Sequence, residues 1–414
     1  MLQPAPGPVI RLVVPEGLGY TSGGTVYNTH VADALRGLGV TVEVVGVPGA
    51  WPVGTDADRR RLRVALDLPD AAVLDVADAA ALDVASAAAL HTHGGATARN
   101  SAMAPASGAA PPAARRAVLV DGLLALGAPD EVYAAAQAAA SSGAALGILV
   151  HMSLADAPGL SAEEAARSAA LEREALAAAR TVLVPSDFAA RRLAERYGTS
   201  ARVARPGVVR VPAAPGSLAE GRAPHLLCLA ALLPGKGQLR LVRALGELRE
   251  MPWTLTLAGH DAADPGYAHA VAVEAARLGI ADRVLIPGEL RGPALETEWS
   301  RTDLTVLASV SETFGLAVAE SLARGVPALV GAGTGAAEAL GLSLAGGLGP
   351  AGTVVGTPGR GTDPLTAELG RWLADPTVRA RWRAAARAAR PLLPGWESTA
   401  LGVARALGVG ALQP

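Results

Sequence analysis

The chain has 414 residues, a formal net charge of -2 and a composition that is 50% hydrophobic but only 3% aromatic. This length suits two or three domains with cores made mainly of alanine, leucine and valine, and the near-zero charge gives no overall field for nucleic acid. The single cysteine, Cys228, excludes an internal disulfide, and no uninterrupted apolar run reaches membrane-spanning length. With no basic leader before an apolar segment, the sequence predicts a soluble cytoplasmic protein.

The chain opens with a pattern typical of a doubly wound α/β unit. Residues 9–14 predict a buried strand, 25–38 a helix with one apolar face, and 41–45 a second strand. The glycine-rich loop between the first strand and the helix contains Gly23 and Gly24. Because ligands bind at the carboxyl end of the first strand in such units, this loop is predicted to be part of a binding site or else a plain tight turn.

The next hundred residues contain two features with more than one interpretation. Residues 51–66 carry four arginines among apolar side chains, which indicates either a helix face for an anionic membrane or acceptor or, more commonly, a solvated surface. Residues 90–116 predict a mobile insertion that is rich in Gly and Pro. His91 and His93 have the side chains of metal ligands, but no third ligand is near them in the sequence, so we expect a solvent-exposed pair.

Two further predicted strands end in polar residues. The strand 117–120 is followed by Asp121, and the strand 146–150 is followed by His151. The carboxyl ends of parallel strands face the ligand crevice, so His151 is the best functional candidate among the seven histidines. The alternative is a capping or core histidine.

The rest of the first domain and the linker after it also carry local signals. Ser161 and Glu164 form a capping-box pattern at the start of a long helix predicted over 161–180. Further on, residues 212–224 are rich in Pro, Gly and Ala, which is typical of an interdomain linker.

The second domain begins with a predicted strand at 225–229, a glycine-rich turn and a helix at 238–249. The turn contains Lys236, which is the single lysine among 36 basic residues. An ammonium at the start of a helix can neutralise a phosphate while the first helical N–H groups donate to it. The alternative is a solvated lysine, and the spacing does not fit a P-loop.

Residues 309–330 carry the most informative pattern in the chain. Glu312 precedes a helix-like run and Glu320 lies within it, eight positions later, while Gly325 and Pro327 end the run. This spacing corresponds to about 12 Å of helical rise, so the two acids can hold opposite ends of one extended ligand.

The start of the same helix offers an anion site between the two acids. The residues concerned are Phe314, Gly315 and Leu316. Their N–H groups have no intrahelical partners if the helix begins here, and they carry the positive end of its dipole.

This segment resembles the family 4 glycosyltransferases, which are retaining sugar-nucleotide transferases of the GT-B fold. The resemblance lies in the two acids, the Phe-Gly pair after Glu312 and the Gly-Val-Pro after Glu320. The resemblance implies two Rossmann-like α/β domains with mostly parallel sheets that face a central cleft, and a C-terminal helix that crosses back to the N-terminal domain. The expected divisions are 1–210, 211–392 and 393–414.

The resemblance also implies roles for residues of the second domain. Glu320 would bind the ribose hydroxyls, Glu312 would lie beside the transferred sugar, and Lys236 would clasp the donor diphosphate. The amides of Phe314, Gly315 and Leu316 would hold the same diphosphate, and main-chain groups around Leu290 would meet the nucleobase.

In the first domain, Gly23 and Gly24 resemble the loop that lies against the donor diphosphate and sugar. His151 resembles the histidine that hydrogen-bonds the transferred sugar. One position departs from the family pattern, because Ala231 stands where an arginine is common, five residues before Lys236. Neutralisation of the diphosphate must therefore depend on Lys236, the helix amides and another arginine.

The implied reaction transfers a sugar from a nucleoside diphosphate sugar, most often a UDP- or GDP-sugar, to a small-molecule, glycan or lipid acceptor. It needs no cofactor and no divalent metal, and neither nucleic acid nor peripheral membrane contact is favoured. The alternatives are an epimerase or phosphorylase of the same fold, or a catalytically weak nucleotide-sugar-binding protein. A nicotinamide-dependent dehydrogenase is disfavoured, because Gly-x-Gly-x-x-Gly with a following acid is absent after Val14. The oligomeric state does not follow from the sequence.

Overall fold

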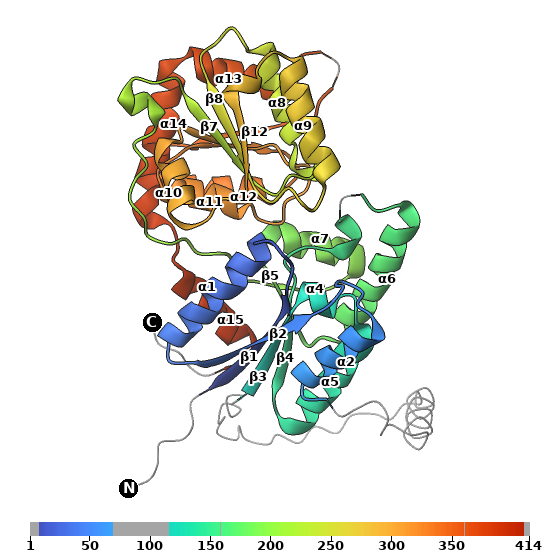
Figure 1. Ribbon diagram of the computed structural model, residues 1–414. Coiled ribbons are helices and arrows are strands. Elements are labelled where there is room, and N and C mark those ends of the chain that lie inside the picture. Colours follow the sequence, from blue (N-terminus) through green and yellow to red (C-terminus); the bar gives the residue numbers. More distant parts are fainter. Residues whose placement is uncertain (1–7, 69–115, 158, 360, 410–414) are drawn as a thin grey trace, which may run out of the picture.

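The computed structural model describes residues 8–68, 116–157, 159–359 and 361–409. These residues form two lobes, each built on a six-stranded parallel sheet with helices on both faces (Figure 1). The strand orders are β2-β1-β3-β4-β5-β6 and β12-β11-β10-β7-β8-β9. The predicted architecture of two Rossmann-like domains is confirmed. The predicted insertion at 90–116, with His91 and His93, lies outside the described residues.

The first sheet consists of β1 (Val9–Glu16), β2 (Thr41–Pro48), β3 (Arg116–Asp121), β4 (Ala145–Leu149), β5 (Thr181–Val184) and β6 (Arg202–Val203). Its helices are α1 (Gly23–Gly37), α2 (Asp56–Ala65), α4 (Gly122–Ala125), α5 (Pro129–Ser142), α6 (Ala162–Ala178) and α7 (Asp187–Tyr197), with a 3-10 turn η2 (Leu154–Asp156). Side chains on both faces of β1 are buried: Ile10 packs with α1, whereas Val13 packs with Leu62 of α2. Strands covered on both faces read as continuous apolar runs, which is why the sequence pattern predicted them.

The second sheet consists of β7 (His225–Leu229), β8 (Thr254–Ala258), β9 (Val284–Gly288), β10 (Leu304–Leu307), β11 (Ala328–Gly331) and β12 (Gly352–Val355). Its helices are α8 (Gln238–Glu247), α9 (Pro265–Arg277), α10 (Gly292–Arg301), α11 (Leu316–Ala323), α12 (Ala336–Gly341), α13 (Pro364–Ala374) and α14 (Pro376–Ala389). The 3-10 turns are η3 (Ser217–Glu220), η4 (Pro234–Lys236), η5 (Ala281–Arg283), η6 (Leu342–Gly346) and η7 (Arg390–Leu392). Every described helix is too short or too polar to cross a bilayer.

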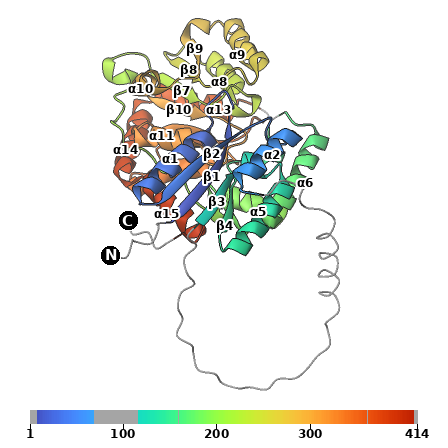
Figure 2. The same cartoon turned by 60° about the horizontal axis from the view of Figure 1, so that its bottom comes forward.

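The last helix, α15 (Trp396–Ala406), returns to the first lobe as expected and lies along α1 (Figures 1 and 2). Its apolar face joins the core cluster of α1 and β1, and the Trp396 ring meets the Tyr27 ring edge-on at 5.4 Å. The two chain crossings between the lobes run side by side, with Val208 bridged to Gly395. A Cβ at Gly207 would come within 2.3 Å of Gly395 and Trp396 main-chain atoms, so this close approach requires glycine.

The carboxyl ends of the two sheets face each other. Ser186 follows the end of β5, and its hydroxyl donates to the carbonyl oxygen of Thr313, which follows the end of β10. At the other edge, Thr21, which follows β1, donates its N–H to Glu289 Oε1 at 3.1 Å, immediately after β9. Because ligands of parallel α/β sheets bind at these strand ends, the lobes enclose the region where a site is expected.

The helix that follows β1 starts earlier than the sequence predicted. Gly23 and Gly24 were expected in the loop, but they are the first two residues of α1. The reason is the Ser22 side chain, whose Oγ accepts the Thr25 N–H at 3.1 Å and so caps the helix at Gly23.

Candidate active site

Lys236 and Glu312 meet at the carboxyl ends of β7 and β10. Lys236 Nζ lies 2.7 Å from Glu312 Oε1, and the same carboxylate oxygen accepts the Ser309 hydroxyl at 3.1 Å. The turn that carries Lys236 lies directly on the segment before Glu312, because Gly237 has a φ of +77° and a Cβ there would come 2.4 Å from the Ala308 carbonyl oxygen. Both side chains are partly shielded, with exposed fractions of 26% for Lys236 and 15% for Glu312.

The segment after Glu312 turns sharply into α11. Phe314 is buried, and Gly315 is the N-terminal cap with a φ of +85°, where a side chain would be strained and would press on Ala336 at 3.0 Å. Leu316 is the first helical residue, so its N–H stands at the positive end of the helix dipole, whereas Phe314 lies before the cap and outside the helix.

Glu320 lies one turn further along α11 and is half-buried. Burial raises the pKa of its carboxyl to about 7; the charge on Arg324 opposes this rise, and the charge on Glu296 adds to it. Arg324 is itself buried, lies over the Trp299 ring at 4.8 Å, and pairs with Glu296 at 2.5 Å. A carboxyl whose pKa is raised in this way keeps its proton to a higher pH than an ordinary glutamate, and its protonated form can both accept hydrogen bonds from hydroxyl groups and donate to them.

In the first lobe, His151 follows β4 and lies against α1. An ideal Cβ at Gly24 would come 2.9 Å from His151 Cδ2, whereas a Cβ at Gly23 would meet nothing within 4 Å. Glycine at position 24 is thus what lets the imidazole approach the helix. His151 Nε2 lies 3.0 Å from Asn28 Oδ1 and 3.4 Å from Asp121 Oδ2.

One apolar contact links the residues of the two lobes. Leu316, at the start of α11, packs against the core cluster of the first lobe that contains Tyr27 and Trp396. The Tyr27 ring in turn meets the His151 ring edge-on at 5.1 Å. The α11 N-terminus therefore adjoins the part of the first lobe that carries His151.

The remaining predicted position, Leu290, follows β9 and packs partly buried against the small cluster that contains Trp299. At Ala231, the position that departs from the family pattern, the carbonyl oxygen accepts the side-chain amide of buried Gln238 at 2.8 Å. This contact is structural, and the alanine side chain brings no charge to the site.

Asn28 is a buried polar residue beside His151 and Asp121 for which the sequence led to no prediction. A buried asparagine on the apolar face of a predicted helix, four positions after a glycine, was the signal that could have identified Asn28. Glu338, at the start of α12, accepts the N–H groups of Asp187 and Phe188 from the other lobe.

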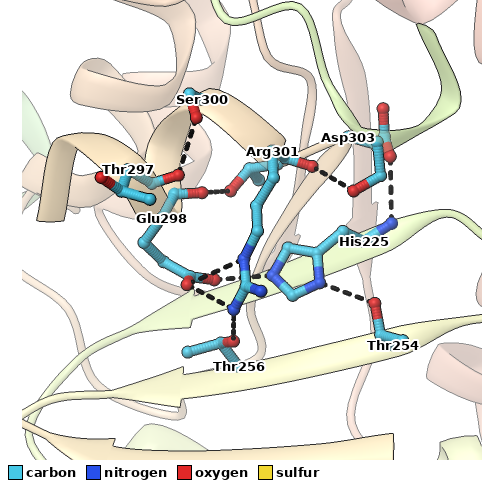
Figure 3. Close-up of polar contacts among 10 residues, drawn as sticks. His225, Thr254, Thr256, Thr297, Glu298, Ser300, Arg301 and Asp303 are labelled. Atoms are coloured by element: carbon cyan, nitrogen blue, oxygen red, sulfur yellow. Dashed lines mark hydrogen bonds and ion pairs between the residues drawn. The ribbon is translucent and has the colours of Figure 1, made fainter. Parts of the chain in front are cut away.

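A second polar cluster lies in the C-terminal lobe (Figure 3). His225 Nε2 is 2.6 Å from Glu298 Oε1, its Nδ1 is 2.7 Å from the Thr254 hydroxyl, and Arg301 pairs with Glu298 at 2.6 Å. His225 and Thr254 are the first residues of β7 and β8, and Asp303 precedes β10. The cluster therefore occupies the amino ends of the strands, opposite the ligand-binding edge, and its role is to satisfy buried polar groups.

Two cavities of about 300 and 200 Å³ lie away from these residues, one between α6 and α7 and one beside Val209 and Arg390. Among the described residues, no three His, Cys, Asp or Glu side chains are grouped so that they could hold a metal ion.

Residues 214–389 match the family model described as glycosyl transferases group 1. The chain is 32% identical over 176 residues to a GDP-mannose-dependent alpha-(1-6)-phosphatidylinositol monomannoside mannosyltransferase of Mycolicibacterium smegmatis, a match that covers 40% of this chain and 43% of the relative. The match thus spans less than half of the relative's length.

Solved structures of similar fold cover nearly the whole chain. Sucrose-phosphate synthase of Thermosynechococcus elongatus superimposes with a TM-score of 0.64 at 16% identity and covers 96% of this chain and 98% of that one. HepE of Anabaena in complex with UDP gives 0.62 at 17% identity, with 96% and 99% covered. At these identities the likeness shows the fold alone.

Proposed function

We propose that this chain, whose residues 214–389 form a group 1 glycosyltransferase domain, is a retaining glycosyltransferase that moves a sugar from a nucleoside diphosphate sugar to an acceptor. The observation that carries the proposal is the meeting of the single lysine with Glu312 at the strand ends that face the other lobe. The alternation of strands and helices alone would suit many activities, whereas an ammonium held at this edge can bind an anionic group.

The chemistry of the reaction explains why an ammonium is needed there. As the bond between the sugar and the diphosphate breaks, the leaving diphosphate gains negative charge and the sugar becomes cationic. Groups that are already positioned to stabilise the developing charge lower the barrier most. In the proposal, Lys236 and the amides of Phe314, Gly315 and Leu316 perform this task, and no divalent metal takes part.

Binding of the donor would change the partner of Lys236. Without donor, the ammonium neutralises the Glu312 carboxylate at 2.7 Å. A diphosphate carries more negative charge than one carboxylate, so it competes effectively for Lys236. Glu312 is then free to accept hydrogen bonds from hydroxyl groups of the transferred sugar. The pair would thus hold both side chains in place between turnovers.

Glu320 would bind the ribose. A carboxyl with a pKa of about 7 suits two neighbouring hydroxyl groups of a ribose. Its protonated form donates a hydrogen bond to one hydroxyl oxygen, and its carbonyl oxygen accepts one from the other hydroxyl group. Leu290 would contribute main-chain contacts to the base, while Gly24 and His151 would approach the sugar from the other lobe, with Gly23 beside them.

The donor is proposed to be a UDP- or GDP-sugar. The relative from Mycolicibacterium smegmatis is named for GDP-mannose, and the HepE structure contains UDP, so GDP-mannose and UDP-glucose are the first donors to test. The acceptor class, whether small molecule, glycan or lipid, is left to the experiment.

The test is a screen of UDP-, GDP- and ADP-sugars, in which hydrolysis of the donor and thermal stabilisation of the protein are measured together. We expect one nucleotide to stabilise the protein and its sugar to be released. Glu320→Ala should weaken nucleotide binding, and Arg167→Ala, which removes a surface ion pair on α6, should change neither readout. Retention would be read from the anomeric proton coupling of the product.

A nucleotide-sugar-binding protein without turnover is the second candidate, and Ala231 favours it. An uncharged side chain where the family commonly has arginine leaves the diphosphate with less positive charge around it. Calorimetric binding of a nucleoside diphosphate with no hydrolysis or transfer of any donor sugar would support this candidate over the enzyme.

A further inference from the structure

Three polar side chains form a connected chain in the first lobe, beside the region where the lobes meet. Asn28 on α1 and Asp121 at the end of β3 are buried, with exposed fractions of 6% and 3%, and His151 after β4 is mostly buried. Asn28 Nδ2 lies 2.6 Å from Asp121 Oδ2, and Asn28 Oδ1 lies 3.0 Å from His151 Nε2. The asparagine thus stands between an acid and an imidazole.

The protonation of Asp121 determines which way the asparagine amide points. Both oxygens of this acid accept hydrogen bonds, Oδ1 from the Leu123 N–H at 2.8 Å and Oδ2 from the Asn28 amide at 2.6 Å, which is the arrangement of an ionised carboxylate. An ionised carboxylate only accepts hydrogen bonds, so the NH₂ group of Asn28 must face it.

The orientation of Asn28 then determines the state of His151. With its NH₂ group facing Asp121, the asparagine presents its carbonyl oxygen to Nε2, and a carbonyl oxygen only accepts. Nε2 must therefore carry a hydrogen. In the neutral ring this leaves Nδ1 as an acceptor, and the described residues provide no hydrogen-bond partner for Nδ1.

The packing around His151 leaves its ring little freedom. Gly24 lies against the Cδ2 edge, and Tyr27, whose hydroxyl donates to the Ala204 carbonyl at 2.7 Å, meets the ring edge-on. If the ring flipped by half a turn about its Cβ–Cγ bond, Cε1 would take the place of Nε2 and the contact with Asn28 Oδ1 would be lost.

We propose that Asn28 is a positioning residue that, together with Asp121, whose Oδ2 lies 3.4 Å from Nε2, holds His151 in the Nε2–H tautomer and presents Nδ1 as an acceptor to a hydroxyl group of the transferred sugar. The inference rests on the proposed function for the identity of that hydroxyl, but the tautomer itself does not depend on any substrate. A neutral Nδ1 acceptor selects hydroxyl donors and not phosphate or carboxylate groups.

The test is ¹⁵N NMR of the full-length protein labelled at histidine, recorded at pH 8 without substrate, with His151→Gln used to assign the signal. We expect the Nε2–H tautomer in the unaltered protein. In Asn28→Leu, which keeps the approximate side-chain size but removes both polar atoms, Asp121 remains 3.4 Å from Nε2 but the nearer acceptor is lost, so exchange of the ring N–H with water should accelerate at least about tenfold. Thr29→Ala, the neighbouring exposed position on α1, should leave the spectrum unchanged.

With a donor that the protein hydrolyses or transfers, Asn28→Leu should lower kcat about tenfold while leaving the affinity for the free nucleoside diphosphate unchanged. An Nδ1–H tautomer in the unaltered protein, or a spectrum of Asn28→Leu identical to it, would overturn the proposal. Should Asn28→Leu fail to fold, the spectrum of the unaltered protein still decides the tautomer. Because the spectra require no turnover, failure of the proposed function and failure of this inference can be told apart.

Discussion

The single lysine of the chain, Lys236, forms an ion pair with Glu312, 76 positions later, at a distance of 2.7 Å between Nζ and Oε1. Strands β7 and β10 lie next to each other in the second sheet, so their following loops bring the two residues together at one edge. The pair is only partly exposed, and an ion pair so shielded holds its geometry better than one in open solvent. Under the proposed function, this pair would already be in place before a donor binds.

Replacing Lys236 tests the electrostatic part of the proposal. Lys236→Ala should lower kcat for donor hydrolysis or transfer about 100-fold, the usual effect of losing one preorganised donor, because the leaving diphosphate loses its ammonium. Lys236→Arg should retain part of the rate, since the charge stays but its geometry changes. Steady-state kinetics would measure both, and unchanged kinetics in Lys236→Ala would count against the assignment.

Two adjacent glycines offer a matched pair of variants. Gly24→Ala places a methyl group 2.9 Å from His151 Cδ2 and should displace the imidazole, whereas Gly23→Ala places it in open space. Both substitutions are in the first turn of α1, so their effects on helix stability should be similar. We expect turnover to fall about tenfold more in Gly24→Ala than in Gly23→Ala. Equal turnover in the two variants would show that the position of His151 does not matter.

Glu320 should make stability depend on pH. Its pKa is raised in the folded protein from 4.5 to about 7, so the folded state binds a proton more tightly than the unfolded state. The unfolded chain binds fewer protons between these two values, and stability therefore falls as the pH rises from about 4.5 to about 7. Glu320→Gln removes this penalty and should stabilise the protein at pH 8, by up to about 2 kcal/mol after allowance for solvent screening, but not at pH 4.5.

The midpoint of thermal unfolding, measured at both pH values, checks this expectation. Glu250→Gln is the control, because its side chain is 90% exposed and should show no difference between the two conditions. A Glu320→Gln variant whose midpoint shifts equally at pH 4.5 and pH 8 would contradict a raised pKa.

Glu338 should help to hold the lobes together. Its carboxylate accepts the N–H groups of Asp187 and Phe188 at 3.1 and 3.0 Å, at the start of α7 in the other lobe, and Arg205 donates to it at 2.8 Å. Glu338→Ala removes an acid from a helix N-terminus, a change that costs about 1 kcal/mol, and it should increase the radius of gyration by favouring open arrangements.

Small-angle scattering of the protein without ligand would measure that increase. Glu368→Ala is the matched control, because within the described residues the Glu368 carboxylate pairs with Arg371 on its own helix and not with the other lobe. Identical scattering from the two variants would mean that other contacts, such as Ser186 with Thr313, hold the lobes without Glu338.

Local sequence patterns were sufficient to predict several strands and the two acids around α11. The strand predicted at 225–229 coincides with β7 and the strand predicted at 117–120 lies within β3, because parallel strands covered on both faces are short apolar runs. Glu312 before α11 and Glu320 within it were also predicted, since a helix with a glycine at its start and Gly325 at its end has clear local signals.

The tertiary structure alone decided which residues meet. No local pattern pairs Lys236 with Glu312, Asn28 with His151 or Glu338 with the start of α7, because each contact joins segments that only sheet order and the arrangement of the lobes bring together. The raised pKa of Glu320 is likewise a property of burial, which depends on neighbours from other elements. Sequence periodicity shows which face of one helix or strand is buried and which is exposed. The chemistry of the site depends on distances between side chains of different elements.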